Sequence, residues 1–154
     1  MKTRTAALLL ATLLVGANLC FAADPNIGTW KLNEAKSKID AGLPKNLTVT
    51  YEAVGESVKA TVDGVDGQGK PTHNEWTGKY DGKDYPVTGD PASDTRSLKK
   101  INERTLELTV KKGDKVTMTG RIVLAADGKS RTLTASGTNA AGKKIRSTSV
   151  YDKQ

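Results

Sequence analysis

Few side chains in this sequence could carry acid–base, nucleophilic or metal chemistry. The chain has one histidine, His73, and one cysteine, Cys20. His73 and Glu75 are two residues apart and would share one face of a strand, but a metal site or an activated nucleophile would need further partners from distant positions. The acidic region from Asp81 to Asp94 lacks the regular spacing of a calcium loop and is more typical of turns. We therefore predict no enzyme activity, no metal site and no cofactor.

Six side chains could instead contact a small organic ligand. Arg131 has the same strand parity as Leu133, so it could point inward and bind an anionic group, or turn outward to solvent. The same two alternatives apply to Arg96, which has the parity of Leu98. The other four would offer a hydroxyl or an indole N–H beside apolar residues. The predicted ligand-binding residues are Trp76, Tyr85, Arg96, Arg131, Ser149 and Tyr151.

A long series of short β-strands would position these side chains. Apolar and polar residues alternate through residues 47–53, and the same period of two recurs in later segments. Turn sequences such as Asp127-Gly128 separate these runs. Only residues 33–40 suit a helix, of a turn or two with Asn33 as its N-cap. We count about ten strands, including the first.

An antiparallel meander with one apolar face must close into a barrel or fold into a sandwich, because an open sheet would leave its edges unpaired. The nearest-neighbour hairpins favour a barrel, and the Cys–Trp–Cys spacing of an immunoglobulin sandwich is missing. We predict an all-β fold, a single antiparallel up-and-down β-barrel of about 8–10 strands, with a β-sandwich as the alternative. The predicted interior comprises Leu47, Val49, Tyr51, Ala60, Val62, Trp76, Gly78, Tyr80, Val87, Leu106, Leu108, Val116, Met118, Gly120, Ile122, Leu133, Ala135, Gly137 and Ile145.

Residues 1–22 have the features of a signal peptide. Two basic residues precede an apolar run too short to span a bilayer, and Ala22 ends an A-x-A-like cleavage site. Lipoprotein processing at Cys20 is the alternative. We predict that residues 23–154 form a single domain, periplasmic or secreted after cleavage near Ala22.

The whole chain is basic, with 24 Lys and Arg against 17 Asp and Glu and a net charge of +7. The aromatic residues fall mostly on apolar faces rather than among exposed basic ones, so we expect no nucleic-acid binding. Beyond the signal, no segment resembles a transmembrane helix. We expect no disulfides, because the only cysteine lies in the signal. We also expect a monomer.

Two segments at opposite ends of the chain carry a resemblance to known barrels. Gly28-Thr29-Trp30-Lys31-Leu32 resembles the first-strand signature of the lipocalin and fatty-acid-binding group. Ser147-Thr148-Ser149-Val150-Tyr151-Asp152-Lys153 resembles the last strand of fatty-acid-binding proteins. Over residues 23–154 the chain also resembles small exported bacterial lipocalin-like proteins of unknown function.

The resemblance implies a calycin-type β-barrel. In lipocalins the tryptophan of this motif closes one end of the barrel and packs against a basic side chain of the final strand. Gly28 and Trp30 would fill the closure positions here, with Arg146 or Lys144 as the nearest match for the basic side chain.

The chain departs from the fatty-acid-binding pattern where that family holds its ligand. The family places an arginine two residues before the last-strand tyrosine, whereas Ser149 stands at that distance before Tyr151. A second internal arginine of the family would fall near Ile122. The two helices that cap the opening have no room in residues 33–45.

These observations leave two hypotheses. The first is an exported, non-enzymatic barrel that binds a small hydrophobic or weakly amphipathic ligand in its interior. The alternative is a packed barrel that acts as an envelope-associated interaction or structural module without a small-molecule ligand. A cavity of several hundred Å³ that reaches solvent beside Tyr151 would favour the first.

Overall fold

The computed structural model describes residues 23–138 and 141–154. The predicted signal peptide, its cleavage after Ala22 and the alternative processing at Cys20 lie outside these residues. The strands are β1 Gly28–Leu32, β2 Lys38–Ile39, β3 Lys45–Val54, β4 Ser57–Val65, β5 Pro71–Gly78, β6 Tyr85–Thr88, β7 Thr95–Asn102, β8 Thr105–Lys112, β9 Lys115–Leu124, β10 Ser130–Thr138 and β11 Lys144–Lys153.

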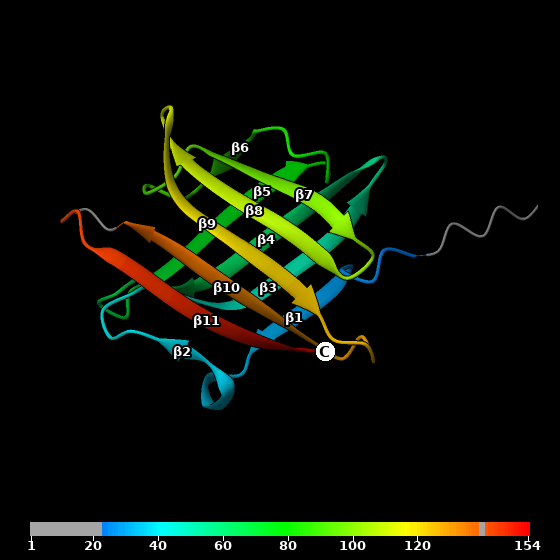
Figure 1. Ribbon diagram of the computed structural model, residues 1–154, viewed down its shortest axis with the longest axis horizontal. Helices are drawn as coiled ribbons and strands as arrows, with labels where there is room; N and C mark the ends of the chain where they lie inside the picture. Colours follow the sequence, from blue (N-terminus) through cyan, green and yellow to red (C-terminus); the bar gives the residue numbers. More distant parts are fainter. Residues whose placement is uncertain (1–22, 139–140) are drawn as a thin grey trace, which may run out of the picture.

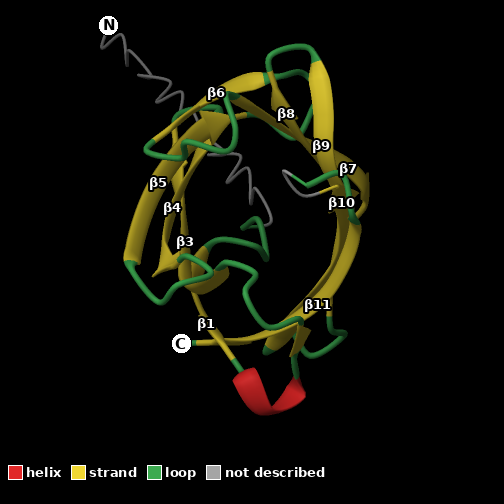
Figure 2. Cartoon of the chain, turned by 90° about the vertical axis from the view of Figure 1, so that its left-hand side faces the viewer, coloured by secondary structure: helices red, strands yellow, loops and turns green. Residues whose placement is uncertain are grey.

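The sheet closes on itself, which confirms the predicted barrel and rules out the sandwich. From β3 to β11 each strand pairs antiparallel with its sequence neighbour, β1 pairs with β3, and β1 pairs again with β11. The closing register sets Trp30 opposite Lys153 and Leu32 opposite Tyr151. Ten strands form the closed wall, and the two-residue β2 is an extra strand beside β11. Figures 1 and 2 show the two opposed walls, with β3–β5 on one side and β9–β11 on the other.

A single short helix interrupts the strands of the described chain. A 3-10 helix, Glu34–Lys36, follows Asn33, whose side-chain oxygen accepts a hydrogen bond from the Lys36 backbone N–H. The predicted N-cap at Asn33 is therefore confirmed, but the helix is one 3-10 turn, and Lys38–Ile39 of the predicted range form β2. No larger helical cap lies over the barrel in the part of the chain that the structure describes.

The barrel interior holds most of the predicted apolar residues, and Trp30, Trp76, Leu98 and Leu106 are its largest fully buried side chains. Val116 was wrongly placed inside, since 47% of its surface is exposed. The pairing of β8 with β9 skips Thr117, so that Val110 faces Met118 and Lys111 faces Val116. This β-bulge inverts the parity of β9 before Met118 and turns Val116 outward.

A second bulge, in β3, changes which side chains of that strand point into the barrel. Asn46 pairs with Gly64 and Thr48 with Asp63, so Leu47 is the extra residue. Leu47 is only partly buried, although alternation placed it inside. A Cβ at Gly64 would collide with the Lys45 carbonyl oxygen, so the strands can approach this closely only because residue 64 is glycine. The bulge therefore re-aims the residue before Leu47.

Candidate functional site

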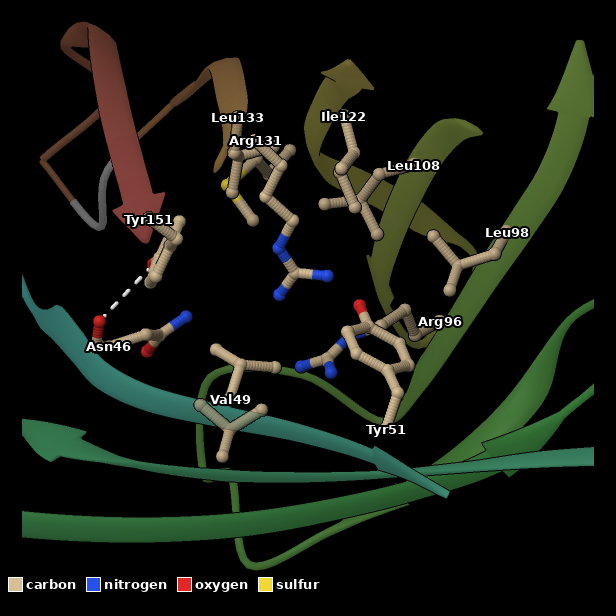
Figure 3. A pocket seen from close by; sticks show the side chains of 12 residues that line it. Asn46, Val49, Tyr51, Arg96, Leu98, Leu108, Ile122, Arg131, Leu133 and Tyr151 are labelled. Carbon is tan, nitrogen blue, oxygen red and sulfur yellow. Dashed lines mark hydrogen bonds between the residues drawn. The ribbon is translucent and has the colours of Figure 1, made fainter. Parts of the chain in front are cut away.

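A cavity of about 60 Å³ lies between the two walls of the barrel. On the scale where one water needs about 10–15 Å³, this volume holds a few waters or a small organic group. Side chains from seven strands surround it (Figure 3): Asn46, Val49, Tyr51, Val62, Arg96, Leu98, Leu108, Met118, Ile122, Arg131, Leu133 and Tyr151.

Arg131 is the most unusual of these side chains, because it is a cation with only 3% of its surface exposed. Arg131 lies in β10, where its register partners are Leu124 of β9 and Tyr151 of β11. Its guanidinium carbon lies 4.6 Å from the Trp30 ring centroid. The corresponding distances are 4.7 Å to Tyr51 and 5.4 Å to Tyr151. Three aromatic rings thus stabilise a buried positive charge by cation–π contact.

The N–H groups of Arg131 are not all used by the protein. Its Nη1 atom is buried and has no hydrogen-bond partner, and Arg131 forms no ion pair with any described residue. The three rings offset the charge, but Nη1 has no oxygen or nitrogen acceptor. Figure 3 shows the guanidinium group directed into the cavity.

Arg96 enters the same cavity from β7. Its Nη2 donates a 3.3 Å hydrogen bond to Asn74 Oδ1, and it makes no ion pair in the described part of the chain. Burial lowers the pKa of Arg96 from its usual value, and the nearby groups of Tyr51 and Asp90 oppose that shift. Arginine nevertheless stays protonated in proteins at neutral pH. Two guanidinium groups therefore face one cavity that no carboxylate lines.

Tyr151 and Asn46 supply polar atoms at another side of the cavity. The Tyr151 hydroxyl donates a 3.2 Å hydrogen bond to the Asn46 carbonyl oxygen (Figure 3). Asn46 lines the cavity because of the bulge at Leu47, and sequence alternation did not identify it. Burial raises the pKa of Tyr151 to about 12, with the Arg131 charge opposing the shift. This hydroxyl is therefore a neutral donor at physiological pH.

The buried tyrosines predict a loss of stability at alkaline pH. The pKa of Tyr151 rises to about 12 in the folded state, against a usual value of about 10. Above pH about 10 the unfolded chain releases a proton that the folded chain retains, so the free energy of unfolding falls until about pH 12. Burial raises the pKa of Tyr80 in the same direction. In denaturant titrations across this range, Tyr151→Phe should show a shallower fall than the wild type; an equal slope would contradict the assignment.

The structure brings together three of the six predicted ligand-binding residues, Arg96, Arg131 and Tyr151. Ser149 is buried, pairs with Leu133 and does not line the cavity. Ser149 is two residues before Tyr151 in β11, so it lies near the cavity, but its side chain does not contact the cavity.

Trp76 and Tyr85 also lie outside the cavity lining. The Trp76 indole N–H donates to the Arg96 carbonyl oxygen at 2.8 Å, so that donor is already used. Tyr85 packs edge-to-face on Trp76, with ring centroids 6.0 Å apart, and its hydroxyl donates to Asp81 Oδ2 at 2.9 Å. Both side chains support the wall that carries Arg96.

Gly28 and Trp30 lie where the barrel closes, as expected, but the basic partner was wrongly assigned. Lys153 lies 5.1 Å from the Trp30 ring centroid, and Arg131 approaches the same ring. Arg146 is exposed and pairs with Ser136, seven residues before Lys153 on β11. Because the closing register joins β1 to the last residues of β11, Lys144 and Arg146 are too early in that strand to reach Trp30.

The segment before β1 packs against the same ring. Trp30 Nε1 donates to the Asn26 carbonyl oxygen at 2.8 Å, and Asn26 donates through its backbone and side chain to Asp24 Oδ1. Lys153 Nζ donates to the Pro25 carbonyl oxygen at 3.1 Å. Both the tryptophan and the terminal lysine are thereby fixed by residues that precede the first strand.

His73 lies on the outer surface, where it pairs with Asp63 at 2.7 Å and is 3.9 Å from Glu75. Among residues 23–138 and 141–154, no three His, Cys, Asp or Glu side chains are grouped so as to hold a metal ion. Within the same residues, no helix has the length and apolar character to cross a membrane.

No protein-family model and no curated protein matches the chain. Among solved structures, the chain is similar to EF1p2_mFAP2b bound to DFHBI, with 13% identity, coverage of 86% of this chain and 97% of that one, and a TM-score of 0.49. It is similar to the redesigned β-barrel mFAP1 bound to DFHBI, with 15% identity, 86% and 98% coverage and a TM-score of 0.48. It is also similar to the redesigned β-barrel b11L5F_LGL, with 14% identity, coverage of 88% of this chain and 97% of that one, and a TM-score of 0.47.

Proposed function

We propose that the protein is an exported, non-enzymatic, lipocalin-like barrel that binds a small organic anion, a carboxylate with a short apolar part, between Arg131 and Arg96. The observation that carries this proposal is the buried, unpaired Nη1 donor of Arg131 beside the cavity. A buried donor without a partner costs about 1–3 kcal/mol, and more when it is charged. An oxyanion in the cavity would remove that cost.

The charge of the cavity supports an anion rather than a neutral ligand. Two guanidinium groups line it and no carboxylate does. Charge-assisted hydrogen bonds from arginine to a carboxylate are frequently bidentate and about twice as strong as neutral ones. Neither arginine forms an ion pair with a described residue, although Asp90 acts on Arg96 from a distance, so an anion between them would supply the direct counter-charge.

The size and lining of the cavity limit the rest of the ligand. Its volume of about 60 Å³ is well below the several hundred Å³ of a typical drug-sized pocket. Val49, Leu108 and Ile122 give it apolar walls. Roughly four to six non-hydrogen atoms fit at 10–15 Å³ each, which corresponds to a carboxylate with a short hydrocarbon chain.

Binding is favoured over catalysis by the residues that line the cavity. They include no histidine, lysine or acid, and the Tyr151 hydroxyl, with its pKa raised to about 12, keeps its proton at neutral pH. General acid–base catalysis needs a group that titrates near the operating pH. A periplasmic or secreted location is proposed from the signal-peptide features of residues 1–22. Intact mass spectrometry of the exported protein tests the cleavage, and the expected mass is that of a chain starting at Ala23.

Calorimetric titration with a matched series tests the binding proposal. Butyrate, 1-butanol and butylamine share a four-carbon chain and differ in head group, so they separate charge from apolar contact. We expect butyrate to bind at least about tenfold more tightly than the alcohol, since one charge-assisted bond is worth about 1.5–3 kcal/mol, and butylamine not to bind. Equal binding of butyrate and butanol, or binding of neither, would contradict the proposal.

A further inference from the structure

Charge is divided unequally between the two walls of the barrel. Residues 95–154, which include β7–β11, contain 14 Lys and Arg against 5 Asp and Glu. Residues 23–94 contain 8 against 12. Within residues 95–154, Arg96 and Arg131 point into the barrel, which leaves 12 of the 14 Lys and Arg residues. Because β7–β11 are consecutive neighbours in the sheet, the excess of basic residues falls on one continuous wall, the near side of the barrel in Figure 1. We call the outer face of β7–β11 the basic wall.

Acidic side chains neutralise only part of the basic wall: Lys100, Lys111 and Lys112 form ion pairs with Glu103, Asp84 and Asp94. Glu103, Asp114 and Asp127 lie in the hairpin turns between its strands. Asp152 accepts a hydrogen bond from Asn33, and Glu107 Oε2 lies 4.0 Å from Arg121 Nη2. Of the exposed cations on this wall, Lys99, Arg104, Lys115, Lys129, Lys144, Arg146 and Lys153 form no ion pair with any described residue. Lys153 instead contacts the Trp30 ring and the Pro25 carbonyl oxygen.

The basic wall also carries exposed aliphatic side chains. The exposed large hydrophobic residues of the described chain are Val54, Ile101, Val116 and Val123, and the last three belong to β7 and β9. Ile101 is 45% exposed, Val116 47% and Val123 44%. Tyr151 is the only aromatic residue after position 94, and it is buried.

We propose that the basic wall docks on an anionic lipid bilayer. Lysine and arginine side chains near an anionic leaflet each strengthen binding, and exposed aliphatic groups can enter the headgroup boundary. Single-stranded nucleic acid would need exposed aromatic rings for base stacking, which the wall lacks. This docking is independent of the cavity and of the anion proposed above, because Arg131 and Arg96 point inward.

Vesicle co-sedimentation tests the docking. The mature chain is mixed with vesicles of phosphatidylcholine alone, or of equimolar phosphatidylcholine and phosphatidylglycerol, at low and high salt. We expect binding to the anionic vesicles only, weakened by salt. The double variant Arg121→Gln, Arg146→Gln should bind roughly 25-fold more weakly, at about fivefold for each cation removed.

The double variant Lys59→Gln, Lys70→Gln is the matched control, because Lys59 lies in β4, Lys70 lies in the turn between β4 and β5 on the opposite wall, and the change in net charge is the same. It should bind within about twofold of the wild type, since its cations would not face the leaflet. An equal loss in both double variants would attribute binding to net charge and overturn the proposal. So would equal binding to neutral vesicles, or tighter binding to single-stranded DNA than to the anionic vesicles. Arg131→Met should retain vesicle binding, which separates this docking from ligand binding in the cavity.

Discussion

Arg131→Met should weaken carboxylate binding by roughly 10- to 150-fold while leaving the empty barrel at least as stable as the wild type. Methionine fills a similar apolar volume and removes a buried, unpaired cation. Replacing buried charged groups with well-packed apolar residues is often neutral or stabilising by about 1–4 kcal/mol. The lost cation–π contacts with Trp30, Tyr51 and Tyr151 reduce that gain.

The loss of binding should be large because Arg131 has the unsatisfied donor. Removal of one charge-assisted hydrogen bond costs about 1.5–3 kcal/mol, or roughly 10- to 150-fold in affinity. Calorimetry with butyrate and thermal denaturation without ligand measure the two effects separately. Arg104→Met, on the exposed surface, is the control and should change neither.

Two outcomes for Arg131→Met would contradict the proposed anion site. Unchanged butyrate affinity would place the anion elsewhere. A loss of several kcal/mol in the free energy of unfolding would make Arg131 a structural member of the aromatic stack rather than a ligand-binding group. Arg131→Lys keeps a charge without the planar fork, so it should retain little of the affinity for butyrate.

Trp30→Ala should destabilise the barrel by about 3–5 kcal/mol, the range for large aromatic residues in a core. Trp30 is fully buried and packs against Arg131 and Lys153. Its removal leaves a cavity, strips Arg131 of one of three rings and orphans the Asn26 carbonyl oxygen. Equilibrium unfolding in denaturant measures the change.

A matched pair of variants separates packing from the hydrogen bond of Trp30. Trp30→Phe keeps a ring without the indole N–H, so it should cost less than the alanine variant. Thr29→Ala, in the same strand but only partly buried, should change the free energy of unfolding by less than about 1 kcal/mol. A loss below about 1 kcal/mol in Trp30→Ala would show that this end of the barrel is closed without the tryptophan.

The fold was predictable because strand parity and turn residues are local properties of the sequence. Alternation placed Arg131 on the face of Leu133 and Ala135 but left open whether its side chain points inward or turns to solvent; in the structure it points inward. Alternation fails wherever a bulge inserts a residue. The bulges at Leu47 and Thr117 turned Asn46 into the cavity and Val116 out of the core.

The chemistry of the site was less predictable, because it depends on contacts between distant strands. The rings around Arg131 come from β1, β3 and β11, and only the closing register shows that they meet. The same register brings Lys153, rather than Arg146, to Trp30. The absence of an arginine at Ser149 argued against an anion site, whereas Arg131 on the neighbouring strand supplies the guanidinium.

The arginine side-chain N–H signals report most directly on whether an organic anion binds between Arg131 and Arg96. In nitrogen–proton correlation spectra titrated with butyrate, the Nε–H signals of Arg131 and Arg96 should shift together with one saturating affinity. The Arg104 and Arg146 signals, on exposed side chains, should not move. Signals of Arg131 and Arg96 that stay fixed, or that shift no more than those of the exposed arginines, would contradict the proposed anion site.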